Sequence, residues 1–183
     1  MLAAVIPAYN EEENIQVVLD NLAQLFSLDV IIPVLNGCTD NTRNAVLAHP
    51  LASRLALIEY PLPLGIDVPR SWGAECALKL GADAVLFTDG DLQGDYASCL
   101  QDLICETLYR NCDLALTNCY PYIGFRSETA RLVLHYREKL NRRLKLFPFI
   151  GLATPSHGPH CVPWTVVELP LTLTAPPELL YMP

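Results

Sequence analysis

The sequence predicts an α/β fold, with a mostly parallel central sheet and helices on both of its faces. Strand-like and helix-like patterns alternate at least four times, which is typical of parallel strands joined by crossover helices. The runs at residues 2–7 and 30–35 are apolar throughout, as expected of strands that are buried on both faces. Right-handed crossovers then bring the loops that follow the strands to one edge of the sheet.

Each element has its own signal in the sequence. Apolar residues recur at helical spacing from about residue 12 to 26, after the first strand. The second strand contains Pro33, which is unfavourable inside a sheet, and a helix to about residue 49 follows it. The remaining patterns predict strands at 55–60, 84–88, 114–117 and 166–170 and helices at about 69–80, 96–110 and 128–146.

Length and composition narrow the class of protein. A chain of 183 residues suffices for one domain with a substantial core. The net charge of −8 argues against a general nucleic-acid-binding protein. The seven cysteines include no Cys-x-x-Cys pair, so free thiols are expected. The start of the chain does not resemble a signal peptide, and we therefore expect a cytoplasmic protein.

Positive charge is concentrated in one segment. Seven of the 12 Lys and Arg residues lie between Arg126 and Lys145. On an acidic protein this indicates an anionic partner at that place, such as a phosphate or the inner face of a membrane. A solvated helix face is the alternative interpretation.

Two carboxylates follow the strand at 84–88. Asp89 and Asp91 are separated by Gly90, which permits a sharp turn, so both side chains are expected to converge. Converging carboxylates repel each other unless a cation lies between them, and their oxygens suit Mg²⁺ or Mn²⁺. A solvated Asp-Gly-Asp turn is the alternative.

Three stretches together resemble a known family. The segments VIPAYNEEENI (5–15), VLNGCTDNT (34–42) and FTDGDLQGD (87–95) are similar to the inverting family-2 glycosyltransferases of GT-A fold, which is Rossmann-like. The third segment most resembles polyprenyl-phosphate (dolichyl-phosphate) sugar synthases. The resemblance implies a metal-dependent hexosyltransferase that moves a sugar from a UDP- or GDP-sugar to an acceptor, with polyprenyl phosphate as one candidate.

The resemblance also implies roles for individual residues. Those expected to contact the nucleotide sugar are Pro7, Ala8, Tyr9, Glu11, Asn36, Arg70, Asp89 and Gly90. Asn36 stands where the family usually has an aspartate, which leaves the base preference open. Asp89, Asp91 and Gln93 are the expected metal ligands, and Asp91 would act on the reaction through the metal. Such a metal would stabilise the charge that develops on the departing diphosphate.

The second half of the chain matches the family less well. We expect residues 1–120 to form the nucleotide-sugar half and 121–183 an acceptor-side segment of the same domain, shorter than in relatives. No carboxylate base can be assigned. His157 or His160 could be a base or a metal ligand, because histidine titrates near neutral pH, and a loop histidine with a structural hydrogen bond is the alternative. A phosphate acceptor would need no base. Peripheral membrane association and a homodimer are further expectations.

Two other classes of function compete with the transferase. A nucleotidyltransferase normally has a glycine-rich basic loop after the first strand, whereas Ala8-Tyr9-Asn10-Glu11-Glu12 has neither glycine nor lysine. A non-catalytic nucleotide-sugar-binding homologue would be consistent with Asn36, the missing base and the short tail.

Overall fold

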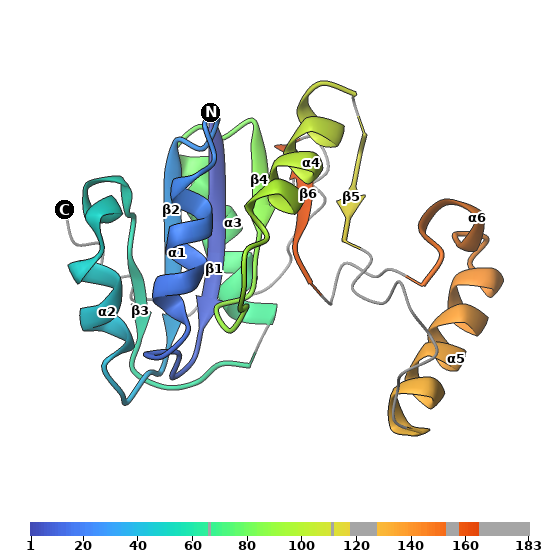
Figure 1. Ribbon diagram of the computed structural model, residues 1–183, viewed down its shortest axis with the longest axis horizontal. Coiled ribbons are helices and arrows are strands. Elements are labelled where there is room, and N and C mark those ends of the chain that lie inside the picture. Colours follow the sequence, from blue (N-terminus) through green and yellow to red (C-terminus); the bar gives the residue numbers. More distant parts are fainter. Residues whose placement is uncertain (66, 111, 118–127, 153–157, 165–183) are drawn as a thin grey trace. The chain divides into compact units, whose positions relative to one another are not determined.

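One mixed sheet organises the molecule (Figure 1). The computed structural model describes residues 1–65, 67–110, 112–117, 128–152 and 158–164. Within these residues six strands follow the order β3-β2-β1-β4-β6-β5. The strands are β1 (Leu2–Ala8), β2 (Val30–Asn36), β3 (Ile58–Tyr60), β4 (Ala84–Phe87), β5 (Ala115–Leu116) and β6 (His160–Pro163). The pairs β1–β2, β1–β4 and β2–β3 are parallel and β4–β6 is antiparallel, which confirms the mostly parallel sheet.

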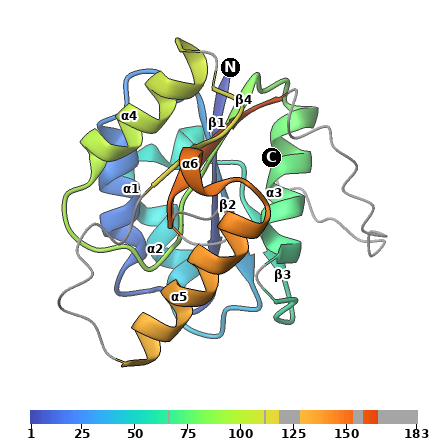
Figure 2. The same ribbon diagram turned by 90° about the vertical axis from the view of Figure 1, so that its right-hand side faces the viewer.

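Helices cover both faces of this sheet (Figure 2). They are α1 (Ile15–Ala23), α2 (Thr42–Ala48), α3 (Asp67–Lys79) and α4 (Ala97–Leu108), and a short 3₁₀ helix, η1 (Pro50–Arg54), follows α2. Side chains of β1 alternate between the faces. Ala4 and Ile6 pack with α1, α2 and α4, whereas Ala3 and Val5 pack with α3. The prediction of helices on both faces is therefore confirmed.

Pro33 lies inside β2, where the sequence made a strand uncertain. The neighbouring strand is interrupted opposite it. Leu55 forms an isolated bridge with Ile31, and the ladder resumes only where Val34 pairs with Ile58. Because proline has no N–H to donate to the ladder, the interruption explains why β3 has three residues instead of the predicted six.

The strand β6 was not predicted. It pairs with β4 from Ala84↔Pro163 to Phe87↔His160 and separates β4 from β5 in the sheet. His160 is buried and its ring stacks on Phe87 with 4.8 Å between centroids. The predicted strand at 166–170 lies outside the described residues.

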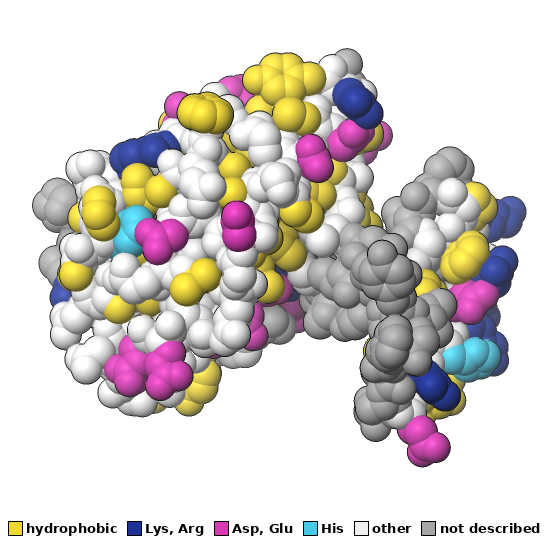
Figure 3. Space-filling view, viewed as in Figure 1, with side chains coloured by type: hydrophobic (Ala, Val, Ile, Leu, Met, Phe, Trp, Pro, Cys, Tyr) yellow, Lys and Arg dark blue, Asp and Glu magenta, His cyan; other side chains and the backbone are white. Residues whose placement is uncertain are grey.

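The described chain divides into two compact units, and the second lies within residues 116–159. It contains α5 (Glu128–Arg143) and α6 (Phe147–Ile150). The predicted helix to Leu146 ends earlier, because Lys145 adopts a positive φ of 60° and Leu146 N–H donates to the Asn141 carbonyl. Figure 3 shows Lys and Arg side chains gathered over α5. The separate roles predicted for residues 1–120 and 121–183 stay a prediction.

The six cysteines of the described part are free thiols, as predicted. None of its helices combines the length and the apolar character that crossing a bilayer would require.

Candidate functional site

The polar loops after β1, β2 and β4 lie at one edge of the sheet, because these strands are parallel neighbours. Side chains bind the first two loops together. Asn10, which has a positive φ of 56°, accepts from Thr39 N–H through Oδ1 at 2.8 Å. The Thr42 hydroxyl accepts from Glu11 N–H at 2.7 Å. The loops therefore form one continuous wall, as their shared position at the sheet edge predicted.

Asp40 strengthens this wall. Its carboxylate accepts from Glu12 N–H at 3.1 Å and from Thr42 N–H at 3.0 Å. Desolvation opposes the charged form, but the hydrogen bonds from Thr42 and Glu12 outweigh it and hold the pKa of Asp40 below its ordinary value. The carboxylate therefore stays ionised at neutral pH and keeps both loops in place.

Asn36 is buried at the end of β2 and is bonded to the loop after β3. Its Nδ2 donates to the Gly65 carbonyl at 2.8 Å, and its Oδ1 accepts from Leu64 N–H at 2.8 Å. Both ends of the amide thus hold residues 64 and 65. The predicted contact with a base or ribose stays a prediction, and it would use the second amide hydrogen or the second lone pair of Oδ1.

Gly90 fits against the end of β1. A Cβ there would lie 3.1 Å from the Pro7 carbonyl oxygen and 3.2 Å from the Ala8 Cβ. A turn lies at residues 90 and 91, as expected, but Gly90 is not among the glycines with a positive φ, so the turn alone does not require glycine. Glycine suits this position because the backbone of Pro7 and Ala8 lies so close. This close contact holds the acidic turn, Asp89-Gly90-Asp91, against the end of β1, where the first loop begins.

Arg70 and Asp89 form an ion pair that the sequence did not predict. Arg70 Nη2 lies 2.6 Å from Asp89 Oδ1, and the side chains are 13% and 24% exposed. Arg70 Nε is buried and has no hydrogen-bond partner. Asp91, two residues further, is exposed. A cationic side chain beside the acidic turn suits a phosphate ligand.

The other predicted residues have different surroundings. Tyr9 is 51% exposed, and the Glu11 carboxylate accepts from Asn14 Nδ2 at 2.9 Å. Gln93 Nε2 donates to Asn14 Oδ1 at 3.0 Å, which leaves its Oε1 as the atom for the predicted metal contact. His157 lies outside the described residues.

Tyr96 lies near the acidic turn and was missed by the sequence reasoning. Burial raises the pKa of its hydroxyl to about 12, and the charges of Asp91 and Asp89 add to this effect. A raised pKa favours the neutral form in the folded state. Its contribution to stability is therefore complete below pH 10, the ordinary pKa of tyrosine, and is lost as the pH rises toward 12.

We expect the free energy of unfolding to respond to Tyr96→Phe in a pH-dependent way. Between about pH 9 and 11 the wild-type chain should lose about 1 kcal/mol more stability than the variant, because only the wild type has this group to ionise. Urea unfolding at both pH values measures the difference. Equal losses would show that Tyr96 titrates normally.

The acidic turn fits a metal that is shared with a ligand. Within the described residues there is no group of three or more His, Cys, Asp or Glu side chains that could hold a metal ion. Mg²⁺ commonly binds through one or two carboxylates and completes its shell with water and substrate phosphates. Asp89 and Asp91 supply that number of carboxylates, so the arrangement suits a cation that binds together with a diphosphate.

Solved structures share this fold. Glucosyl-3-phosphoglycerate synthase from Mycobacterium tuberculosis in complex with UDP has a TM-score of 0.66 and 21% identity, over 89% of this chain and 56% of that one. The same enzyme with Mn²⁺, UDP-glucose and phosphoglyceric acid gives 0.66 and 20%, with the same shares covered. Residues 1–349 of S. aureus TarS give 0.55 and 21%, over 69% and 38%. The chain thus spans little more than half the length of the first neighbours.

Comparison by sequence gives a family. No curated protein matched the chain. The family described as glycosyl transferase family 2 matches residues 3–161, which include the three segments that carried the resemblance and every described site residue. The chain belongs to glycosyl transferase family 2.

Proposed function

We propose that this chain transfers a sugar from a nucleoside-diphosphate sugar to an acceptor and requires Mg²⁺ or Mn²⁺. The observation that carries the proposal is the Asp89-Gly90-Asp91 turn, which packs against Pro7 and Ala8 beside Arg70. Membership of the family supports it. The neighbours support it as well, since one enzyme was solved with UDP, with Mn²⁺ and UDP-glucose, and with Mg²⁺ and UDP.

The two carboxylates of the turn and the polar residues near it would have separate roles in this reaction. Asp89 and Asp91 would hold the cation, with Gln93 Oε1 as a further oxygen ligand. A bound divalent cation supplies Lewis-acid stabilisation of the negative charge on a departing diphosphate. Arg70 adds a fixed positive charge beside Asp89.

The wall formed by the loops after β1 and β2 would bind the nucleoside. Pro7 and Ala8 end β1, Tyr9 and Glu11 lie in the loop after it, and Tyr9 is 51% exposed. Asn36 can donate and accept through its amide, whereas an aspartate only accepts, so both UDP- and GDP-sugars are candidate donors. The base preference then depends on the amide hydrogen that is not bonded to Gly65 and on the second lone pair of Oδ1.

A phosphate is the acceptor group that we propose, and polyprenyl phosphate is the lipid that would carry it. A phosphate is already ionised and needs no catalytic base. On α5 and at the residue after it, an apolar stripe is more than half exposed and consists of Leu132, Tyr136, Leu140 and Leu144. The same helix carries Arg131, Arg137, Lys139, Arg142 and Arg143. An exposed apolar stripe among basic residues suits the surface of an anionic bilayer, which implies a cytoplasmic protein peripheral to the inner face of the membrane. A second copy on the stripe would give the homodimer that the sequence led us to expect.

An acceptor assay tests this proposal. The chain would be incubated with UDP-glucose or GDP-mannose and Mn²⁺, with polyprenyl phosphate in anionic vesicles, soluble 3-phosphoglycerate or a neutral polyol. We expect transfer to polyprenyl phosphate, whose only acceptor group is the phosphate, and none to the hydroxyl groups of the polyol. Leu140→Asp should weaken binding to the vesicles, measured by co-sedimentation, about tenfold. Burial of a leucine side chain in the bilayer would contribute about 1.5–3 kcal/mol to binding.

The control for the membrane arm is Leu78→Asp, which alters an exposed leucine on α3 instead of α5. It should leave vesicle binding unchanged. Equal losses in both variants would contradict the membrane proposal, and transfer only to soluble 3-phosphoglycerate would contradict the lipid acceptor. Tight nucleotide-sugar binding without transfer to any acceptor would instead identify a non-catalytic homologue.

A further inference from the structure

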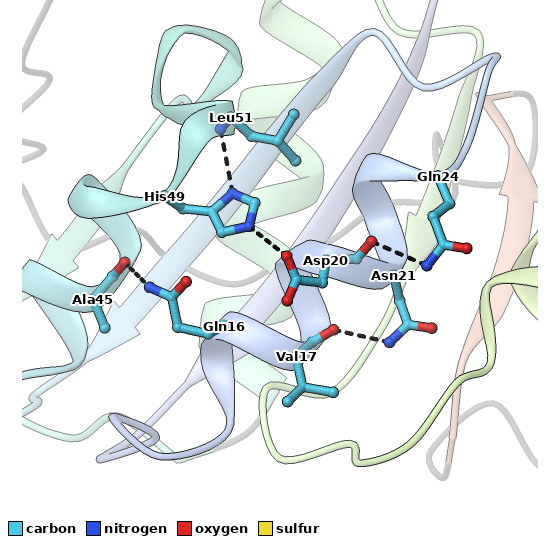
Figure 4. Close-up of polar contacts among 8 residues, drawn as sticks. All are labelled: Gln16, Val17, Asp20, Asn21, Gln24, Ala45, His49 and Leu51. Carbon is cyan, nitrogen blue, oxygen red and sulfur yellow. Dashed lines mark hydrogen bonds and ion pairs between the residues drawn. The ribbon is translucent and has the colours of Figure 1, made fainter.

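A buried amide on α1 is bonded to the loop that follows Asp91. Asn21 is 3% exposed. Its Nδ2 donates to the Val17 carbonyl at 2.8 Å within the helix and to the Gly94 carbonyl at 3.0 Å. Its Oδ1 accepts from Tyr96 N–H at 2.8 Å. Figure 4 shows the amide on α1 with its bond to Val17. Asn21 thus contacts the backbone three and five residues beyond Asp91.

The acceptor and both donors of the Asn21 amide are in use, so it has no spare group for a ligand. A side chain that satisfies two backbone groups of one loop fixes both the position and the direction of that loop. Removal of the amide would leave the Gly94 carbonyl and Tyr96 N–H without this partner. Gly94 is exposed, whereas Tyr96 is partly buried, and a backbone group that loses its partner away from water is costly. Residues 94–96 would then have to rearrange.

Other contacts attach the same loop to α1 and to the core. Gln93 donates to Asn14, at the start of α1, and Leu92 packs against the core that α1 lines. Gly94 has a φ of 86°, a conformation that L side chains rarely adopt. The loop between Asp91 and α4 is therefore held in one conformation from the α1 side, with Asn21 as its buried anchor.

The geometry points to Asn21 as a positioning residue that sets the place of Asp91 and so the affinity of the site for its divalent cation. The inference rests on the proposed function. Residues that orient metal ligands from behind typically change metal affinity by about 10–100-fold when they are lost. We expect a loss in that range, although Asn21 contacts neither cation nor nucleotide.

The neighbouring residue on the helix provides a matched control. Asp20 Oδ1 lies 3.1 Å from His49 Nε2, and His49 Nδ1 accepts from Leu51 N–H at 3.2 Å (Figure 4). This contact joins α1 to the segment after α2 and does not involve the loop between Asp91 and α4. Asp20→Asn therefore alters a polar contact of the same helix and leaves the loop intact.

The test compares Asn21→Leu with Asp20→Asn and wild type. Mn²⁺ binding in the presence of UDP would be measured by electron paramagnetic resonance, and amide hydrogen exchange would be followed in the peptides covering residues 88–99. In Asn21→Leu we expect Mn²⁺ affinity to fall about 10–100-fold and the loop amides to exchange faster. Asp20→Asn should change neither. If Asn21→Leu does not fold, Asn21→Asp keeps the acceptor for Tyr96 and loses the donor to Gly94.

The readouts separate two kinds of failure. Wild-type protein that binds no Mn²⁺ with UDP would contradict the proposed function, while the exchange rates would still decide whether Asn21 holds the loop. Wild-type binding together with unchanged affinity and exchange in the Asn21 variants would overturn the inference alone.

Discussion

Asp91→Asn is expected to lower metal-dependent sugar transfer by about 10²–10³-fold. Loss of one group that stabilises charge in a transition state has an effect of this size. The substitution keeps the shape of the side chain and removes its charge, so a divalent cation would lose its exposed carboxylate ligand. Asp89 cannot compensate fully, because Arg70 already occupies its Oδ1 at 2.6 Å. Initial rates at saturating Mn²⁺ and donor measure the effect.

Asp95→Asn is the matched control for this variant. Asp95 is an exposed carboxylate in the same loop, four residues beyond Asp91. It should keep nearly wild-type rates if the charge at position 91 matters through direct metal contact. Equal rate losses in the two variants, or a loss below tenfold in Asp91→Asn, would contradict a direct metal contact of Asp91. The rate would then depend only on the overall negative charge of the loop.

Gly37→Ala is expected to destabilise the fold by about 3 kcal/mol. Gly37 follows Asn36 and has a positive φ of 74°, which is unfavourable for an L residue by roughly 1–2 kcal/mol. A Cβ would also lie 2.4 Å from the Pro63 nitrogen and 2.6 Å from the Leu62 carbonyl carbon. These are backbone atoms, so the loop after β3 would have to move, and overpacking of this kind typically costs about 1–3 kcal/mol. Urea unfolding measures the loss.

Gly81→Ala separates the two causes. Gly81 has a similar φ of 85°, but a Cβ at this position would have open space, with no heavy atom outside its chain neighbours within 4 Å. This variant should lose only the part due to backbone conformation, about 1 kcal/mol. If Gly37→Ala were no more destabilising than Gly81→Ala, the close approach to residues 62 and 63 would have no energetic weight.

The sequence was sufficient for the elements whose signals are local. The apolar runs of β1 and β2 and the helical spacing in α1 located the sheet and its first helix. The strand β6 carries no such signal. It is four residues long, contains His160 and Pro163, and is stabilised by pairing with β4, more than 70 residues earlier in the chain. Pairing over such a separation leaves no local pattern in the sequence.

The place of the candidate site at the edge of the sheet was predictable, and the contacts between its residues were less so. The end of β1 and the acidic turn meet at Gly90, as the sheet topology implied. The ion pair between Arg70 and Asp89 was not foreseeable, since it joins two elements 19 residues apart. The bonds of the Asn36 amide to the backbone of Leu64 and Gly65 were not predicted either, and its contact with a nucleotide stays a prediction. Side-chain direction of this kind depends on the packed structure.

Location of Mn²⁺ by anomalous scattering, in crystals grown with and without UDP, tests the central claim most directly. We predict one ion bound to the Asp91 carboxylate and to the diphosphate of UDP, and a much lower occupancy of that position without UDP. An ion that binds equally well without the nucleotide would contradict the account. An ion that occupies only positions remote from Asp91 would contradict it as well.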